Sequence, residues 1–346
     1  MEISAIGLDL AKSVFQVHGI DAVGQVVLRR RLKRGQVLPF FTKLPRCLIG
    51  IEACASAHYW ARELQALGHD VRLIPPQYAK AYVKRNKTDP ADAAAICEAV
   101  TRPSMSFVPI KSLDQQSELS VHRVRSLLIG QRTALVNALR SHLAEFGLVA
   151  PTGGQHLTKV VALIEEPGLP PPLVTMMRQI VEQITALGRA IDVCNWQMLA
   201  QHRSNPTSRR LATAPGIGVV LANALAASVS DPADFKSGRQ FAAWLGMVPK
   251  QASSGEAIRL GRISKMGNEY LRRLFVSGAM AAIVAARRRP DRANPWLLNM
   301  LAQKKPLLLI AVALANKMAR IAWAMMVRGT DYQPGHLSHP PMPVTA

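Results

Sequence analysis

The chain has 346 residues, which is long enough for two or three domains that each bury a core. Its 43 Lys and Arg residues exceed its 22 Asp and Glu residues, and the formal net charge is +21. Such a surplus favours a polyanionic partner that is bound through salt-dependent phosphate contacts. Because aromatic residues make up only 5% of the chain, extensive base stacking is not expected.

A membrane surface is the competing polyanion, and the sequence argues against it. Residues 1–12 are strand-like and already carry three charged residues, so we expect no signal peptide. The longest apolar stretches, 274–286 and 306–315, are too short to span a bilayer. Lys317 and Arg320 interrupt the second stretch, and both stretches are predicted to be buried helices.

The four cysteines are Cys47, Cys54, Cys97 and Cys194. They form no Cys-x-x-Cys pair, and none has a neighbouring His or Cys at zinc-like spacing. We expect reduced core thiols in a cytoplasmic protein.

Residues 1–110 alternate β-rich runs with helical segments. Three strands followed by a strand, a helix, a strand and a helix are typical of an RNase H-like (RuvC-like) α/β domain. The pattern predicts strands over 3–10, 14–19, 26–31, 47–51 and 71–74, and a helix over 57–67 that ends at Gly68.

Four acidic residues of this first part have the setting of a metal-binding carboxylate set. Asp9 and Glu52 each follow or end a strand-like run. Asp89 and Asp92 open a predicted helix, with Asp89 as its N-cap and Pro90 in the first helical position. That spacing projects both aspartates toward one side of the first turn. Mg²⁺ and Mn²⁺ take carboxylate oxygens, so the set predicts a nuclease-like divalent metal site.

Each carboxylate also has a structural explanation. Asp and Glu are common at strand ends and helix starts, and a capping role would explain Asp89 fully. The metal hypothesis therefore depends on the four residues as a set within a basic chain.

Residues 111–202 are predicted to be mostly helical and carry a net charge of only +1. Apolar residues recur at three- and four-residue steps over 113–146 and 173–200, with proline- and glycine-rich segments between. Two antiparallel core helices, or a coiled coil with another subunit, explain this pattern equally well.

Residues 203–330 carry most of the excess charge, with 20 basic and 5 acidic side chains. The run Pro-Gly-Ile-Gly at 215–218 lies between apolar helices and predicts a helix-hairpin-helix in a mainly α-helical domain. Gly216 and Gly218 would let backbone N–H groups approach a phosphate, although a tight turn without a ligand is the alternative.

A glycine-punctuated segment follows and contains Ser253 and Ser254. Four cations surround these serines and could bind phosphate and stabilise transition-state charge. These cations are Lys250, Arg259, Arg262 and Lys265, and the next predicted helix, 268–288, adds Arg272 and Arg273. The polar, proline-rich tail over 331–346 is predicted to be disordered.

The order and spacing of these motifs resemble the DEDD transposases of bacterial insertion sequences, insertion-sequence family one-ten. The resemblance covers nearly the whole chain. The segments that carry it are GLDLAK, IEAC, NKTDPADA, APGIG, FAAWLGMVPKQASSG and RISKMGNEYLRRL.

The resemblance implies a RuvC-like domain that holds Mg²⁺, or Mn²⁺, through the four acids. It also implies a C-terminal transposase domain whose serine attacks a DNA phosphate and becomes joined to the strand. Ser254, which immediately precedes Gly255, matches the nucleophile position better than Ser253. A histidine base for this serine would have to come from a distant position such as His122 or His142.

The resemblance further implies the partners of the chain. In this family a non-coding bridge RNA pairs with target and donor DNA and so chooses the sites. Family members work as dimers or tetramers, and the serine of one subunit completes a site on the RuvC-like domain of another. The expected partners are therefore element-end and target DNA, the RNA and further copies of the chain, without a membrane.

Two other functions remain open from the residues. A structure-specific nuclease that hydrolyses DNA with metal-activated water would need the four acids and be indifferent to Ser254. A non-catalytic nucleic-acid-binding protein would use the acids only structurally.

Overall fold

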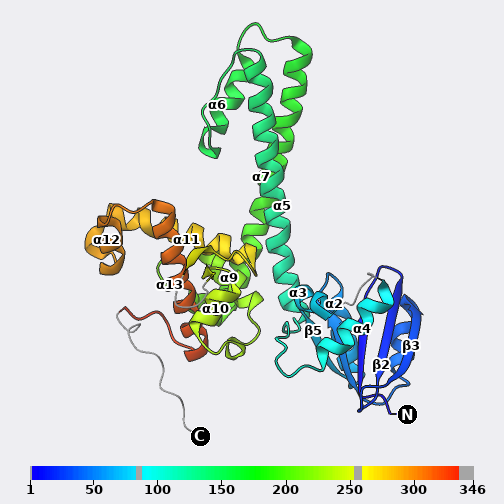
Figure 1. The fold of residues 1–346 in the computed structure, drawn as a ribbon. Coiled ribbons are helices and arrows are strands. Elements are labelled where there is room, and N and C mark those ends of the chain that lie inside the picture. The colour runs from blue at the N-terminus through cyan, green and yellow to red at the C-terminus, as the bar shows by residue number, and fades with distance from the viewer. Residues whose placement is uncertain (1, 83–87, 253–258, 335–346) are drawn as a thin grey trace. The chain divides into compact units, whose positions relative to one another are not determined.

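The computed structural model describes residues 2–82, 88–252 and 259–334. These residues belong to two compact units, Met1–Ser112 and Leu113–Ala346, each of which is described by itself. The predicted middle and third parts of the chain share the second unit. Figure 1 shows a sheet with helices in the first unit and an almost entirely helical second unit.

The first unit contains a five-stranded sheet in the order β3-β2-β1-β4-β5. The three N-terminal strands pair antiparallel, while β4 pairs parallel with both β1 and β5. This mixed sheet confirms the predicted α/β organisation, with each strand within a few residues of its expected place. The strands are β1 (Ala5–Asp9), β2 (Val14–Ile20), β3 (Val26–Lys33), β4 (Leu48–Glu52) and β5 (Asp70–Ile74).

Both faces of this sheet are covered by buried clusters. Successive side chains along each strand point to opposite faces, so neighbouring residues belong to different clusters. Ile6 and Leu8 of β1 are fully buried in a cluster that includes Trp60 and Leu64 of one helix. Ala5 belongs instead to a cluster on the opposite face, which contains Ile96 and Val100 of α4. The helices of this unit are α1 (Val37–Phe41), α2 (Ala57–Ala66), α3 (Pro76–Ala79) and α4 (Asp89–Val100).

Helix α4 packs on β1 and β4 at unusually short range, because both strands carry a glycine beneath it. A Cβ added to Gly7 would lie closer than 3.0 Å to the backbone of Ala93 and Cys97. A Cβ added to Gly50 would lie 2.7 Å from the Cβ of Val100. The two glycines therefore set the distance between α4 and the sheet.

The second unit begins with a long antiparallel helical hairpin made of α5 (Leu113–Glu145) and α7 (Pro171–Ser204), which lie side by side in Figure 1. A hydrogen bond of 2.6 Å from Arg125 Nε to Asn195 Oδ1 joins them near one end. At the other end, Leu139 and Leu143 are fully buried with Val160 of α6 (Leu157–Ala162). The predicted pair of antiparallel helices is thus present within one chain.

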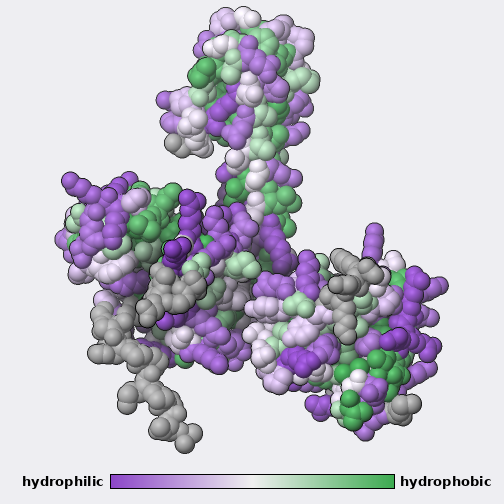
Figure 2. Space-filling model, in the orientation of Figure 1, coloured by the Kyte–Doolittle hydropathy of each residue, from purple (hydrophilic) through white to green (hydrophobic). Residues whose placement is uncertain are grey.

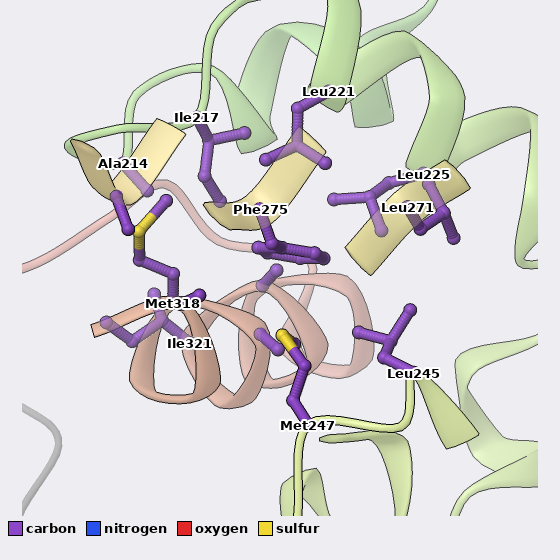
Figure 3. Close-up of a cluster of buried hydrophobic side chains, with 14 of the residues drawn as sticks. Ala214, Ile217, Leu221, Leu225, Leu245, Met247, Leu271, Phe275, Met318 and Ile321 are labelled. Carbon is purple, nitrogen blue, oxygen red and sulfur yellow. The ribbon is translucent and has the colours of Figure 1, made fainter. Parts of the chain in front are cut away.

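The remaining helices pack around one large apolar core, part of which is drawn in Figure 3. Phe275 lies at its centre among Ile217, Leu221 and Leu225, and faces Met247. A short two-stranded ribbon, which the sequence did not predict, joins this helical domain. The elements are α8 (Pro206–Leu211), α9 (Val219–Ser228), α10 (Gly238–Trp244), β6 (Pro249–Gln251), β7 (Leu260–Ile263), α11 (Glu269–Arg288), α12 (Pro295–Ala302) and α13 (Leu307–Arg328).

Helix α13 is longer than the sequence predicted. It continues past Lys317 and Arg320 to 22 residues, and 18 consecutive residues of it have a mean hydropathy of 1.6, so it is long and apolar enough to cross a membrane. However, the helix packs against α10 and α11, and Ile310, Ala311 and Ala322 are buried in the domain core. A core helix of a globular domain explains this composition.

The predicted core thiols are confirmed at three of the four positions. Cys47, Cys97 and Cys194 are buried and free, and burial raises the pKa of Cys47 and of Cys97 to about 11. The prediction is wrong for Cys54, which is exposed because it lies in the turn after β4.

The close approach of α4 predicts a large cost for any side chain at Gly7. Gly7→Ala should destabilise the first unit by about 3 kcal/mol, since its methyl group meets helix backbone that cannot rotate away. Hydrogen exchange of segments 5–9 and 89–100 in the full chain measures this loss. Gly35→Ala is the matched control, because a Cβ there meets nothing within 4 Å. Equal protection in both variants would contradict the packing argument.

Candidate functional site

The two strand-end acids lie at the same edge and on the same face of the sheet. Asp9 is the last residue of β1 and Glu52 the last residue of β4. These strands pair parallel with Leu8 opposite Ile51, so the acids follow on neighbouring strands. Asp9 is two residues after Gly7 and Glu52 two residues after Gly50, so both acids share the face that α4 covers.

The other two acids lie in the first turn of α4. Asp89 is the first helical residue, and Thr88, with extended backbone, is the N-cap. The prediction that Asp89 caps the helix is therefore wrong by one position: the Thr88 carbonyl already accepts the N–H of Asp92, at 3.0 Å. The shift frees the Asp89 side chain from a capping role. The partial positive charge at the helix N-terminus favours both aspartates there.

Asp9 feels the charges of the other three acids. Burial, followed by the negative charges of Asp92, Asp89 and Glu52 in that order, raises the pKa of Asp9 from 3.8 to about 6. A hydrogen bond from the backbone of Leu10 opposes this rise. The close packing of α4 thus brings its first turn to the edge of the sheet, where the charges of Asp92 and Asp89 act on Asp9.

These residues fit a hard divalent cation by the chemistry of their donors. All four are carboxylates, and the repulsion that raises the pKa of Asp9 is the kind that a bound cation relieves. Within residues 2–82, 88–252 and 259–334, no three His, Cys, Asp or Glu side chains are close enough to form a complete metal-binding group. The chemistry of the four donors therefore fits a cation, while the described side chains are not gathered around a common point.

In the second unit, the two glycines of the predicted turn between α8 and α9 have different surroundings. Gly216 has a φ of +83°, and a Cβ there would lie 2.7 Å from Met318 Cε and 2.9 Å from the Gly278 carbonyl oxygen. Gly218 is exposed at the N-cap of α9, and a Cβ there would meet nothing within 4 Å. Gly216 therefore shapes the turn, while the backbone at Gly218 is open to a ligand.

The predicted phosphate-binding cations also differ in their surroundings. Lys250, Arg259, Arg262 and Lys265 are exposed on or beside the β6–β7 ribbon. Arg272 donates from Nη1 to the carbonyl oxygens of Leu245, at 3.0 Å, and Met266, at 3.4 Å, so it holds the chain around Gly246. Exposed Arg273 lies over the Tyr270 ring, 5.5 Å from its centroid.

Ser253 and Ser254 lie outside the described residues, between β6 and β7 in the chain. The two histidines suggested as a base for the serine differ in their surroundings. His122 is 1% exposed, and its Nδ1 is 2.8 Å from the Tyr270 hydroxyl and its Nε2 2.7 Å from Asn223 Oδ1. Burial lowers the pKa of His122, so the neutral ring links three helices. His142 is half-exposed on α5, 3.9 Å from Glu145.

Comparison with known proteins decides the family. Residues 208–294 match the family described as "Transposase IS116/IS110/IS902 family", and residues 6–147 match the DEDD transposase domain of the same group. A Pseudomonas aeruginosa protein named "Probable family 20 transposase" is 50% identical over 97% of this chain and 100% of its own length. The chain belongs to the IS110 family of insertion-sequence transposases.

Two further relatives of this transposase are named after insertion sequences. The transposase of element IS1328 from Yersinia enterocolitica is 38% identical over 95% of this chain and 98% of its own length. The transposase of element IS1111A from Coxiella burnetii is 36% identical over 96% and 92%. Membership implies an enzyme that acts on DNA and whose DEDD domain depends on divalent metal.

Sequence reasoning missed the two glycines that position the acids of this transposase. Gly7 precedes Asp9 by two residues, and Gly50 precedes Glu52 by two residues. A small residue that faces a helix two positions before a strand-end acid is a signal that could have been read from the sequence.

The raised pKa of Asp9 predicts a pH-dependent effect of Asp9→Asn in metal-free buffer. The ordinary value is 3.8 and the folded value about 6, so the folded protein holds this proton more tightly. The contribution of Asp9 to stability therefore falls as pH rises from about 4 to about 7. Asn carries no charge, so the variant should gain stability above pH 6 and none below pH 4.

Solvent screening of this half-buried carboxyl limits the gain to about 1–2 kcal/mol at pH 7.5. Denaturant unfolding at pH 4 and pH 7.5 measures it. Glu63→Gln, on the helix α2 that covers the opposite face, is the control and should show no such difference. A pH-independent effect of Asp9→Asn would refute the crowding of charge around Asp9.

Proposed function

We propose that this transposase cuts and exchanges DNA strands through the four carboxylates of its first unit and the hydroxyl of Ser254. The observation that supports the proposal is the effect of three negative charges, those of Asp92, Asp89 and Glu52, on the pKa of Asp9 at one edge of the sheet. Repulsion between neighbouring carboxylates destabilises the fold. A catalytic site explains why such a group of acids is present, whereas a structural role does not.

The four acids would hold Mg²⁺, with Mn²⁺ as an alternative ion of the same ligand preference. Once bound, the metal would supply Lewis-acid polarisation of a phosphodiester. The fold positions the four acids as follows. Parallel strands β1 and β4 hold Asp9 and Glu52 at one edge, and the N-terminus of α4 presents Asp89 and Asp92.

The nucleophile in this proposal is Ser254. Its Oγ would form a bond to phosphorus while one bond from phosphorus to a nucleotide oxygen breaks, and that oxygen leaves as a hydroxyl after taking a proton. The serine proton would pass to a base. His122 does not fit that role, because both of its ring nitrogens already have partners in the domain core.

Exposed cations on either side of Ser254 support the same proposal. Lys250 precedes the serine, and Arg259, Arg262 and Lys265 follow it. Their positive charge would bind the phosphate and offset the negative charge that develops on it. Arg272 contributes by holding the chain around Gly246, where its guanidinium bonds two backbone carbonyls.

We further propose that a bridge RNA of the element selects the DNA sites. A chain with a net charge of +21 and 5% aromatic residues suits recognition of backbones and duplex shape. If base pairing supplies the sequence specificity, the protein needs few contacts to base edges.

The hairpin of α5 and α7 supports assembly into a dimer or tetramer. Leu127 is 60% exposed and Trp196 is 68% exposed, with Val124 and Val193 also exposed beside them. The Arg125–Asn195 hydrogen bond places these two stretches next to each other across the hairpin. Apolar patches interrupt the polar surface of this region in Figure 2. Such a stripe is what a further copy of the chain would cover.

Covalent trapping tests the proposed chemistry. The full chain is incubated with Mg²⁺, the element RNA and end-containing DNA, then denatured, digested and mapped by mass spectrometry. A nucleotide adduct is expected on Ser254, and it should be lost in Ser254→Ala. Asp9→Ala, Glu52→Ala and Asp92→Ala should lose cleavage by at least a thousandfold while DNA and RNA binding stays intact.

Ser253→Ala is the control that separates the two adjacent serines. Cleaved DNA without any adduct would assign the chain to the hydrolytic nucleases that act through metal-activated water. Retained strand exchange in any of the three acid variants would contradict the metal role.

The proposed helix-hairpin-helix contact predicts different effects at its two glycines. Gly218→Ala should leave the fold intact and weaken DNA binding about fivefold, because the methyl group blocks approach to the turn. Its salt dependence should match that of the parent chain, since no cation is lost, whereas Arg262→Gln should give a shallower slope. Fluorescence anisotropy across a salt series measures both. Unchanged binding by Gly218→Ala would rule out a phosphate at this turn.

A further inference from the structure

A large cavity opens beside the Pro215–Gly218 turn and has no part in the chemistry above. Its volume is about 680 Å³, within the range of roughly 300–1,000 Å³ that is typical of small-molecule sites. Its walls are formed by residues 214–217, the C-terminal end of α11 with the segment that follows it, the start of α12, one side of α13, and Tyr332 and Pro334 beyond α13. All of these elements belong to the second unit.

The walls of this cavity are apolar and built from small side chains. Ala282, Ala285 and Ala286 of α11 form one side, and Ile217, Met318 and Ile321 border the domain core. Figure 3 shows the last three at the edge of that core, with Met318 close to Ala214. The alanines leave room for a flat ligand. Figure 2 shows hydrophobic surface bordered by hydrophilic surface in the region of α12 and α13.

Three cations line the same cavity: Arg289, Arg292 and Lys317. The Lys317 ammonium lies over the Trp296 ring, 4.6 Å from its centroid, and both residues line the cavity. Arg292 also approaches Asp291 at 3.8 Å, but both side chains are about three-quarters exposed, and such a pair is weak. The cavity therefore combines apolar walls with positive charge.

We propose that this cavity receives one unpaired nucleotide, with its base between the apolar walls and its phosphate against Arg289, Arg292 and Lys317. The apolar side chains of the cavity would contact the base, and its cations would contact the phosphate. An apolar molecule would make no use of the three cations, and a bare phosphate would leave the alanine-lined space unfilled.

The electrostatics of Lys317 agree with an anionic ligand. Burial, and then the positive charge of Arg320, lowers the pKa of Lys317 below its ordinary value. A phosphate beside the ammonium would offset the repulsion. The position of the cavity agrees too, because Pro215, Gly216 and Ile217 line it and directly precede Gly218, where the backbone is open to a phosphate.

This inference rests on the proposed nucleic-acid binding and adds a specific ligand to it. It requires a base to leave its stack, which is unfavourable in a paired duplex and much less so at a bulge. A duplex with a single bulged nucleotide should therefore bind the full chain about tenfold more tightly than the same duplex fully paired. DNA and RNA duplexes are tested separately, because either nucleic acid could supply the nucleotide.

Ala285→Phe tests the cavity itself. Ala285 is exposed on α11 and lines the cavity, so the new ring fills the space without disturbing the core. Val284→Phe is the control, since Val284 is 45% exposed, adjacent on the same helix and outside the cavity lining. Ala285→Phe should abolish the preference for the bulge and leave binding of the paired duplex within twofold. Val284→Phe should keep the preference.

A second readout uses 2-aminopurine as the bulged base. Its emission should change on binding to the parent chain and to Val284→Phe, and stay constant with Ala285→Phe. Arg292→Gln should lower the bulge preference about threefold through loss of one phosphate contact. A preference for the DNA bulge, the RNA bulge or both would support the cavity as a nucleotide site. It would also show which nucleic acid supplies the nucleotide.

Equal binding of bulged and paired duplexes, or a bulge preference that survives in Ala285→Phe, would overturn the inference. Either result would leave the proposed strand chemistry untouched, because paired-duplex binding and Ser254 trapping are measured separately. Loss of all nucleic-acid binding by the parent chain would instead contradict the proposed function.

Discussion

The close packing of one helix against two strands is the constraint on which the first unit depends. Gly7 and Gly50 let α4 approach β1 and β4 at a distance that any side chain would prevent. Asp9 and Glu52 lie two residues further along these strands, on the same face and at the same edge. The first turn of α4 then brings Asp89 and Asp92 to the edge, where their charges act on Asp9. Because two glycines lack a side chain, carboxylates from three distant segments lie near enough for their charges to act on Asp9.

The two units differ in their charge and packing. The first unit concentrates carboxylates at the edge of a rigid mixed sheet, whereas residues 203–330 carry 20 of the basic side chains on a helical core. Within that helical domain, the structure separates supporting residues from available ones. Gly216 and Arg272 hold the chain in place, while Gly218 and Arg262 remain open to a ligand.

Much of the first unit could be predicted because its signals are local. Alternation, turn residues and the Asp-Pro helix start located the strands and α4 to within a few residues. The N-cap was misplaced by one residue, since Thr88 and Asp89 are both acceptable caps and only the backbone decides between them. The β6–β7 ribbon was missed because its exposed, charged strands have no apolar alternation. The burial of His122 depends on contacts with Tyr270 and Asn223, 148 and 101 residues away, which no local pattern contains.

Binding of Mn²⁺ to the full chain without nucleic acid tests the central claim most directly. Electron paramagnetic resonance of free Mn²⁺ at pH 7.5 gives the affinity of the parent chain and of single variants. The account predicts that Asp9→Asn, Glu52→Gln and Asp92→Asn each weaken binding at least tenfold, while Glu63→Gln on α2 has no effect. Equal Mn²⁺ affinity in all of these proteins would show that the four carboxylates do not act as one metal site.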